Sequence, residues 1–120
     1  MKNNLLSLLL VALVLPACVQ KAYDKTIVFT LVVKGKKDIQ SVGVRGNGHP
    51  LSWREDYPLQ EVVKDSLYRG MVQIRTGFLE GEIKFTVNNT FELEDQPNRT
   101  VKLAPKNDTT YYEAVFDQKD

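Results

Sequence analysis

The stretch Glu82–Val101 gathers side chains that are able to bind a ligand. Residues 82–88 alternate apolar and polar side chains, which predicts a half-buried strand with Lys84 on its polar face. Phe91 and Asn98 follow within a short distance along the chain. An ammonium group, an aromatic ring and an amide can contact a ligand together. This unit therefore predicts a small binding surface and not a catalytic one.

Acidic side chains and one histidine are the candidates for catalysis or metal binding. Glu92, Glu94 and Asp95 are adjacent on a predicted exposed strand, whereas acid–base catalysis needs carboxylates that converge on a pocket. We interpret them as solvated charges that discourage edge pairing. His49 lies in a predicted loop without ligand-type spacing around it. No nucleophile elbow, metal motif or paired-acid pocket is present, so we expect no enzymatic activity, no metal and no cofactor.

The first eighteen residues have the pattern of an export signal. Lys2 precedes the apolar run Leu5–Leu15, which is too short to span a bilayer stably. Ala17 and Cys18 then resemble the lipobox of bacterial lipoproteins. The resemblance implies a signal peptide at 1–17, a lipidated Cys18, a lipid-anchored spacer at 18–25, and a place in the bacterial cell envelope, with the outer membrane expected and the leaflet left open. The alternative is an ordinary secretory signal with one unpaired cysteine.

Composition narrows the possible partners. The chain has 16 Lys and Arg against 15 Asp and Glu, and removal of Lys2 with the signal would balance them. Balanced charge argues against nucleic acid or acidic lipid as the main partner. Cys18 is the single cysteine, so disulfides and cysteine–metal sites are excluded from the rest of the chain. About a hundred residues are enough to bury a core without such crosslinks.

Short alternating segments separated by turn residues predict an all-β sandwich of seven or eight strands over 26–117, with a tail at 118–120. No segment keeps a helical period. The predicted strands are Thr26–Val33, Ile39–Arg45, Tyr57–Leu59, Leu67–Arg75, Glu82–Asn88, Thr90–Glu94, Arg99–Leu103 and Thr110–Phe116.

A series of short motifs resembles a known family. In chain order they are Val-Arg-Gly-Asn at 44–47, Leu-Ser-Trp at 51–53, Tyr-Pro-Leu at 57–59, Ile-Lys-Phe at 83–85 and Pro-Asn-Arg at 97–99. Together they resemble the starch-binding domains, which are carbohydrate-binding modules of families 20 and 48, and the related modules that precede some bacterial esterases and hydrolases. The resemblance runs from Thr26 to Phe116. It implies an immunoglobulin-like antiparallel β-sandwich that binds α-glucans without catalysis.

The resemblance also implies a role for four residues. Trp53 matches a tryptophan that stacks on a sugar, and Phe91 falls near the second stacking position, where the family usually has tryptophan. Lys84 matches a lysine that hydrogen-bonds a sugar hydroxyl, and Asn98 matches a further polar contact. The region 34–41 has no aromatic residue, so we expect no second sugar site. Flat aromatic rings suit the apolar C–H faces of pyranose rings.

Other interpretations stay open from the sequence alone. Trp53 is also consistent with a core position, and Phe91 with burial beside Leu93 on one strand face. Lys84 without Trp53 beside it would be an ordinary solvated lysine, and Asn98 also suits a turn. The expected partners are an oligosaccharide or polysaccharide, by default an α-glucan, and a membrane contacted through the lipid. The alternative function is a protein-interaction module of a cell-envelope assembly that has lost glycan binding.

Overall fold

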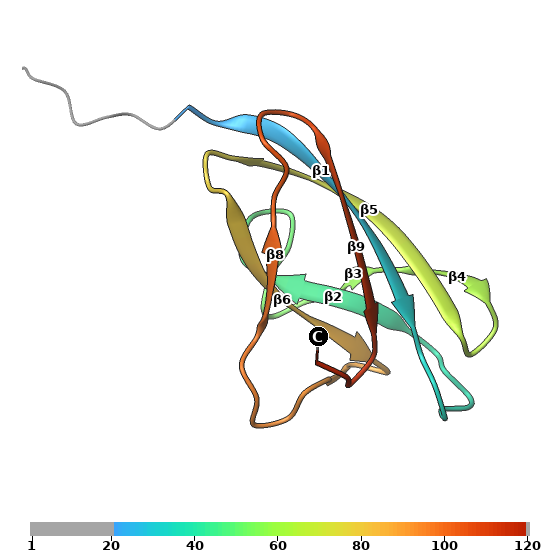
Figure 1. The fold of residues 1–120 in the computed structure, drawn as a ribbon. Helices are drawn as coiled ribbons and strands as arrows, with labels where there is room; N and C mark the ends of the chain where they lie inside the picture. Colours follow the sequence, from blue (N-terminus) through green and yellow to red (C-terminus); the bar gives the residue numbers. More distant parts are fainter. Residues whose placement is uncertain (1–20, 120) are drawn as a thin grey trace, which may run out of the picture.

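The computed structural model describes residues 21–119, which form two β-sheets and no helix (Figure 1). The described chain contains nine strands, of which β3 and β7 have only two residues each. The predicted all-β class is confirmed. The strands are β1 Tyr23–Val32, β2 Val42–Gly46, β3 Tyr57–Pro58, β4 Gln60–Val63, β5 Leu67–Thr76, β6 Glu80–Val87, β7 Thr90–Phe91, β8 Arg99–Lys102 and β9 Thr109–Val115.

The two sheets differ in strand order, and in the second sheet β6 pairs with two strands along the same edge. The first sheet has the order β4-β5-β1-β9, and the second has the order β3-β2-β6-β7, with β8 also paired to β6. β8 pairs with the start of β6 and β7 pairs with its end, so residues 92–98 leave the sheet between the two. This excursion forms one wall of the candidate site.

One strand pair departs from the expected antiparallel arrangement. β1 pairs antiparallel with β5, but it pairs parallel with β9, with Ile27 opposite Thr110 and Leu31 opposite Ala114. The expected antiparallel sandwich therefore contains one parallel pair, at the edge strand β9. The alternation of apolar and polar residues along a strand predicts which face is buried, but it gives no information about the direction of the neighbouring strand.

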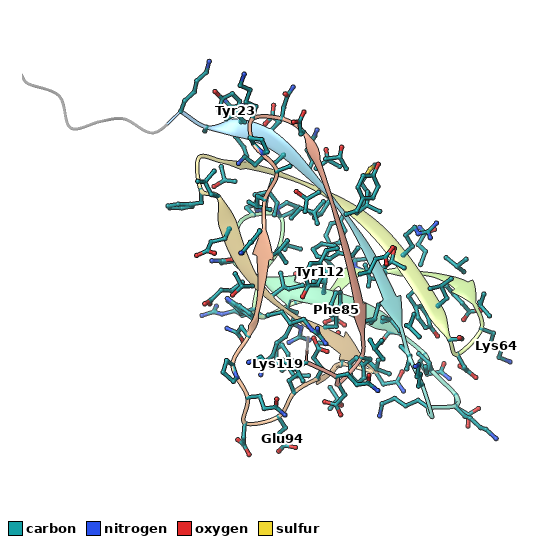
Figure 2. The ribbon with its side chains drawn as sticks, viewed as in Figure 1. Tyr23, Lys64, Phe85, Glu94, Tyr112 and Lys119 are labelled. Atoms are coloured by element: carbon teal, nitrogen blue, oxygen red, sulfur yellow. The ribbon has the colours of Figure 1, made fainter. Side chains whose placement is uncertain are left out.

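Alternating side chains from both sheets form the core. Ile27, Phe29 and Leu31 of β1 are at most 2% exposed, as their spacing predicts. Phe29 packs edge-on against Phe85 of β6 with ring centres 5.8 Å apart, and Tyr112 of β9 stacks on Phe85 at 6.4 Å. Figure 2 shows Phe85 and Tyr112 together between the sheets. The aromatic cluster joins the first sheet to the second behind the candidate site.

The folded region begins earlier than predicted. β1 begins at Tyr23, three residues before the expected boundary at Thr26. Lys25 lies within the predicted spacer, yet it is only 2% exposed, and its ammonium group donates to the carbonyl of Phe78 at 3.1 Å. Long lysine side chains can bury their stems when the charged end has a partner. Cys18 and the predicted signal peptide at 1–17 lie outside the described residues.

A turn at Asn88-Asn89 joins β6 to β7, as the adjoining predicted strands Glu82–Asn88 and Thr90–Glu94 require, but the second strand is shorter than predicted. Both asparagines have positive φ, 51° and 63°, as a tight hairpin turn requires. The predicted strand Thr90–Glu94 ends at Phe91, because Leu93 adopts a φ of 52° and turns the chain inward. Within residues 21–119, no helix is long and apolar enough to cross a membrane.

Candidate ligand-binding site

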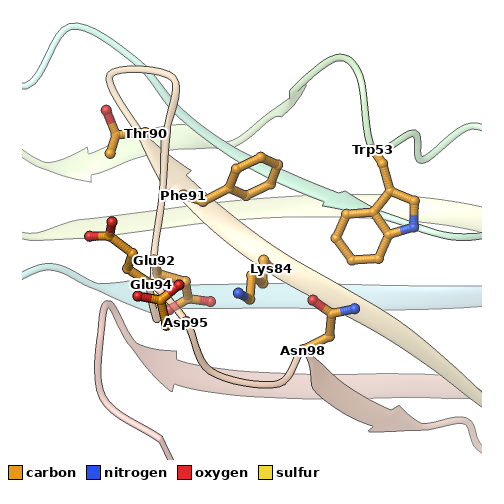
Figure 3. A pocket seen from close by; sticks show the side chains of 8 residues that line it. All are labelled: Trp53, Lys84, Thr90, Phe91, Glu92, Glu94, Asp95 and Asn98. Atoms are coloured by element: carbon orange, nitrogen blue, oxygen red, sulfur yellow. The ribbon is translucent and has the colours of Figure 1, made fainter.

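The four residues singled out in the sequence line one open cavity of about 470 Å³ on the outer face of the second sheet (Figure 3). Trp53 and Phe91 flank it, and Lys84 and Asn98 lie between and below them. They come from four separate parts of the chain. The complete lining is Trp53, Lys84, Thr90, Phe91, Glu92, Glu94, Asp95 and Asn98.

Trp53 is presented by the loop 47–56, between β2 and β3. Its side chain is 37% exposed, so it is not a core residue. Leu51, two residues earlier, is buried at 5% exposure and anchors the loop on the core. The carbonyl of Ser52 accepts a hydrogen bond from the amide of Gly46 at 3.3 Å. Anchored on both sides, the loop leaves the indole facing the cavity.

An ion pair beneath the loop fixes its second half. Asp56 accepts from Arg45 Nε at 2.7 Å and from the hydroxyl of Thr86 at 2.8 Å. The Asp56 side chain lies directly over Gly43, where an added Cβ would come within 2.6 Å of it. The two charged side chains are only 14% and 16% exposed. Partial burial makes this contact stronger than a surface ion pair and ties the loop to β2 and β6.

Phe91 forms the second aromatic wall. It lies opposite Thr86 in the β6–β7 pair and is 39% exposed. The guanidinium of Arg45 lies 4.9 Å from the centre of its ring, a cation–π contact. Arg45 also donates to the carbonyl of Trp53 at 3.4 Å. Arg45 therefore connects the two aromatic residues of the site.

Lys84 and Asn98 supply polar groups to the cavity. Lys84 lies opposite Arg45 in the β2–β6 ladder, and its ammonium donates to the carbonyl of Leu93 at 3.0 Å. An ammonium carries three N–H donors, so donors beyond that bond can serve a ligand. Asn98 is half-buried and donates through Nδ2 to Glu82 at 3.4 Å. Both groups are positioned by protein contacts before any ligand arrives.

Glu92 differs from the sequence prediction. It was expected to be a solvated edge charge, yet it is 0% exposed and forms an ion pair with Arg99 at 2.7 Å. Its carboxylate also accepts from the amides of Phe85 at 2.8 Å and Asp117 at 3.1 Å. Because four donors satisfy it, the carboxylate can stay buried and charged. The expectation was wrong because the strand turns inward after Phe91.

Arg99 completes this buried pair and holds the far end of the 92–98 excursion. Its Nη2 donates to Glu92 and to the carbonyls of Val115 and Gln118 at 2.9, 2.9 and 2.6 Å. Burial alone would lower the pKa of Arg99, but the hydrogen bond and charge of Glu92 outweigh it, so its pKa is raised. The guanidinium thus stays charged and keeps the cavity wall in place.

The remaining carboxylates do not form a catalytic arrangement. Glu94 and Asp95 are exposed on the rim of the cavity, whereas Glu92 is already bound by Arg99. Among the residues that the structure describes, no cluster of three or more His, Cys, Asp or Glu side chains is arranged to hold a metal ion. The cavity instead brings two aromatic side chains, Trp53 and Phe91, together with the polar groups of Lys84 and Asn98.

Two positioning residues were missed by the sequence analysis. Arg45 lies within the Val-Arg-Gly-Asn motif at 44–47, but it was assigned no role, and Asp56 belongs to none of the motifs. The missing information was the register, which sets Arg45 beside Lys84. Asp56 had no sequence signal, because its role depends on the path of the loop.

Comparison with known protein families and with characterised proteins finds no match to this chain. The resemblance to starch-binding domains and to lipoproteins therefore stays a prediction. The geometry of the cavity is the main support for a function.

Proposed function

We propose that this protein is a membrane-anchored, non-catalytic carbohydrate-binding module. The observation that carries the proposal is that Trp53 and Phe91, 38 positions apart in the sequence, flank one open cavity that also contains Lys84 and Asn98. Two aromatic faces with polar groups between them match the apolar faces and polar edges of sugar rings.

The energetics suit weak binding of an oligosaccharide. Fully burying one aromatic side chain contributes on the order of 1.5–3 kcal/mol, and both rings are already partly covered in the free protein. Association also costs several kcal/mol in lost translational and rotational freedom. Weak affinity is sufficient for a module held beside a polymer, because neighbouring sugar units and tethering raise the effective concentration.

The family resemblance makes an α-glucan the first ligand to test, and the lipobox resemblance makes Cys18 the proposed lipid attachment point. Each buried CH₂ of an acyl chain contributes about 0.8 kcal/mol, so several chains would hold the protein at a membrane. The proposed location is the bacterial cell envelope, with the outer membrane as the expected membrane.

Titration of the chain from Val19 onward tests the proposal, since this segment contains all nine described strands. Maltoheptaose and a panel of unrelated glycans are added while amide chemical shifts are recorded. We expect shifts around Trp53, Lys84 and Phe91, and their loss in Trp53→Ala. Phe78→Ala is the matched control, because Phe78 is exposed but lies outside the cavity. A flat response to every glycan would remove the proposed function.

The alternative of a protein-interaction module has one observation in its favour. β4 is the edge of the first sheet, and all four of its residues are exposed, including Val62 and Val63 at 52% each. An exposed edge strand with apolar side chains can accept a strand from a partner protein. Chemical-shift changes confined to β4 on addition of envelope proteins would favour this second function.

A further inference from the structure

A second exposed apolar feature lies outside the cavity lining. The β5–β6 connection at 77–79 presents two adjacent large side chains, Phe78 and Leu79, which are 70% and 65% exposed. Adjacent large apolar side chains that are exposed on a folded protein often mark a surface that contacts another protein or a membrane. The position of this tip in the fold indicates which partner would cover it.

The protein holds this tip in an outward position. The carbonyl of Leu79 accepts from the amide of Leu103 at 2.8 Å, and the carbonyl of Phe78 accepts from the buried Lys25 ammonium at 3.1 Å. The amide of Phe78 donates to the hydroxyl of Thr76 at 3.0 Å. With the backbone bonded on both sides, the two side chains project from a fixed base.

The tip lies at the end of the sandwich where the chain enters the fold. Tyr23, the first residue of β1, is paired with Thr76, the last residue of β5. Figure 1 shows the start of β1 and the β5–β6 connection at the same end of the molecule. Tyr23 is five residues after Cys18. Even a fully extended segment of that length spans only about 17 Å.

We propose that this end of the sandwich docks on a lipid bilayer, with Phe78 and Leu79 inserted beside the lipid anchor. The inference rests on the anchoring part of the proposed function and does not depend on glycan binding. The short distance from Cys18 is what selects the membrane as the occupant, because an acylated Cys18 leaves this end little room to move away from the surface.

The surrounding chemistry fits the region between lipid headgroups and acyl chains. The Lys21 ammonium lies 5.3 Å from the centre of the Tyr23 ring, and lysine and tyrosine are both common at this depth. Beneath the tip, an apolar hollow of about 250 Å³ is lined by Phe78, Ile74 and Leu103 among others. The apolar surface at this end therefore extends beyond two side chains.

Apolar contact is the driving force, and attraction to anionic lipid is not. Asp24 is paired with Arg75 at 3.1 Å, and Glu80 lies opposite Lys102, so these two basic residues near the tip have acidic neighbours. Docking in this orientation would point the opposite end of the sandwich away from the bilayer. The 92–98 excursion, which walls the cavity, lies at that opposite end (Figure 1). This wall of the cavity would then face away from the bilayer.

Depth-dependent quenching tests the proposal on the full, acylated chain in phosphatidylcholine vesicles with brominated acyl chains. Phe78→Trp is introduced in a Trp53→Phe background, so that a single tryptophan reports from the tip. Val62→Trp in the same background is the control, since Val62 is exposed on β4, away from this end. We expect a blue-shifted emission and several-fold stronger quenching at position 78 than at 62. Equal quenching at both positions, or none at either, would overturn the proposal.

Mass spectrometry of the same preparation reports acylation of Cys18. An unacylated chain would overturn the docking proposal together with the anchoring on which it rests. If the wild-type chain bound no glycan, the docking proposal would still stand, because the quenching measurement involves no sugar. Both single-tryptophan variants substitute exposed positions, so neither is expected to disturb folding.

Discussion

The guanidinium of Arg45 lies 4.9 Å from the centre of the Phe91 ring, and the same side chain reaches Asp56 at 2.7 Å. One cation thus holds an aromatic wall of the cavity and the base of the loop that carries Trp53. This link gives the site a defined shape before a ligand binds, which reduces the ordering cost of weak binding.

Replacing Arg45 with methionine should destabilise the protein by about 1–3 kcal/mol, because the partly buried Asp56 carboxylate loses a charged partner. Urea unfolding followed by circular dichroism measures the change. The matched control is Arg75→Met, which breaks the well-exposed pair with Asp24 and should cost about 0–1 kcal/mol. Equal effects of the two substitutions would contradict the role given to Arg45. We also expect glycan affinity to fall in Arg45→Met.

Removing one partner of the buried Glu92–Arg99 pair should have a larger effect. Arg99→Met leaves the Glu92 carboxylate buried without its counterion, and we expect a loss of about 3–5 kcal/mol. Combining it with Glu92→Leu should recover part of that loss, because no charge then remains buried. Urea unfolding of the two single variants and the double variant measures the coupling. Additive losses would show that the pair does not act as a unit.

Enlarging the second aromatic wall should strengthen sugar binding. Phe91→Trp adds a wider flat face, and an aromatic contact of this kind is worth roughly 0.5–1.5 kcal/mol, so affinity should rise by up to about tenfold. Isothermal titration with the glycan found by screening measures it. Tyr111→Trp serves as a control because Tyr111 is 75% exposed on the other sheet. A tighter complex in both variants would indicate that the added tryptophan binds the glycan nonspecifically.

Alkaline pH should destabilise the fold through Tyr68. Burial, with the nearby charges of Glu61 and Asp65, raises the pKa of Tyr68 above its ordinary value. The unfolded chain therefore loses this proton first, so the stability is fully present below about pH 10 and declines as the pH rises toward the higher folded pKa.

Tyr68→Phe removes that proton and isolates the effect. Between about pH 9 and 11, the free energy of unfolding of the variant should fall less steeply than that of the wild type. Thermal unfolding across this range measures both. Tyr111→Phe is the control, because it removes a hydroxyl from an exposed tyrosine and leaves the Tyr68 phenol in place. Parallel slopes for wild type and Tyr68→Phe would contradict the assignment.

Local pattern predicted much of the scaffold. The alternation of Ile27, Phe29 and Leu31 gave the buried face of β1 correctly, and Asn88-Asn89 marked a turn that both residues occupy with positive φ. These features depend on neighbours in the chain, because side-chain period and backbone preference act over a few residues. For the same reason, the polar direction of Lys84 could be predicted without knowing the fold.

Tertiary structure decided the features that join distant segments. The sequence did not decide whether Trp53 lies in the core or on the surface. Trp53 became a wall of the cavity only because the loop 47–56 is held in place by the contact between Asp56 and Arg45. Glu92 became a buried ion because the chain turns inward at Leu93 toward Arg99. The alternation of apolar and polar residues likewise could not predict that β1 and β9 pair in parallel. In each case the deciding contact joins residues that the local sequence does not relate, and its stability comes from burial that exists only after the sheets have packed.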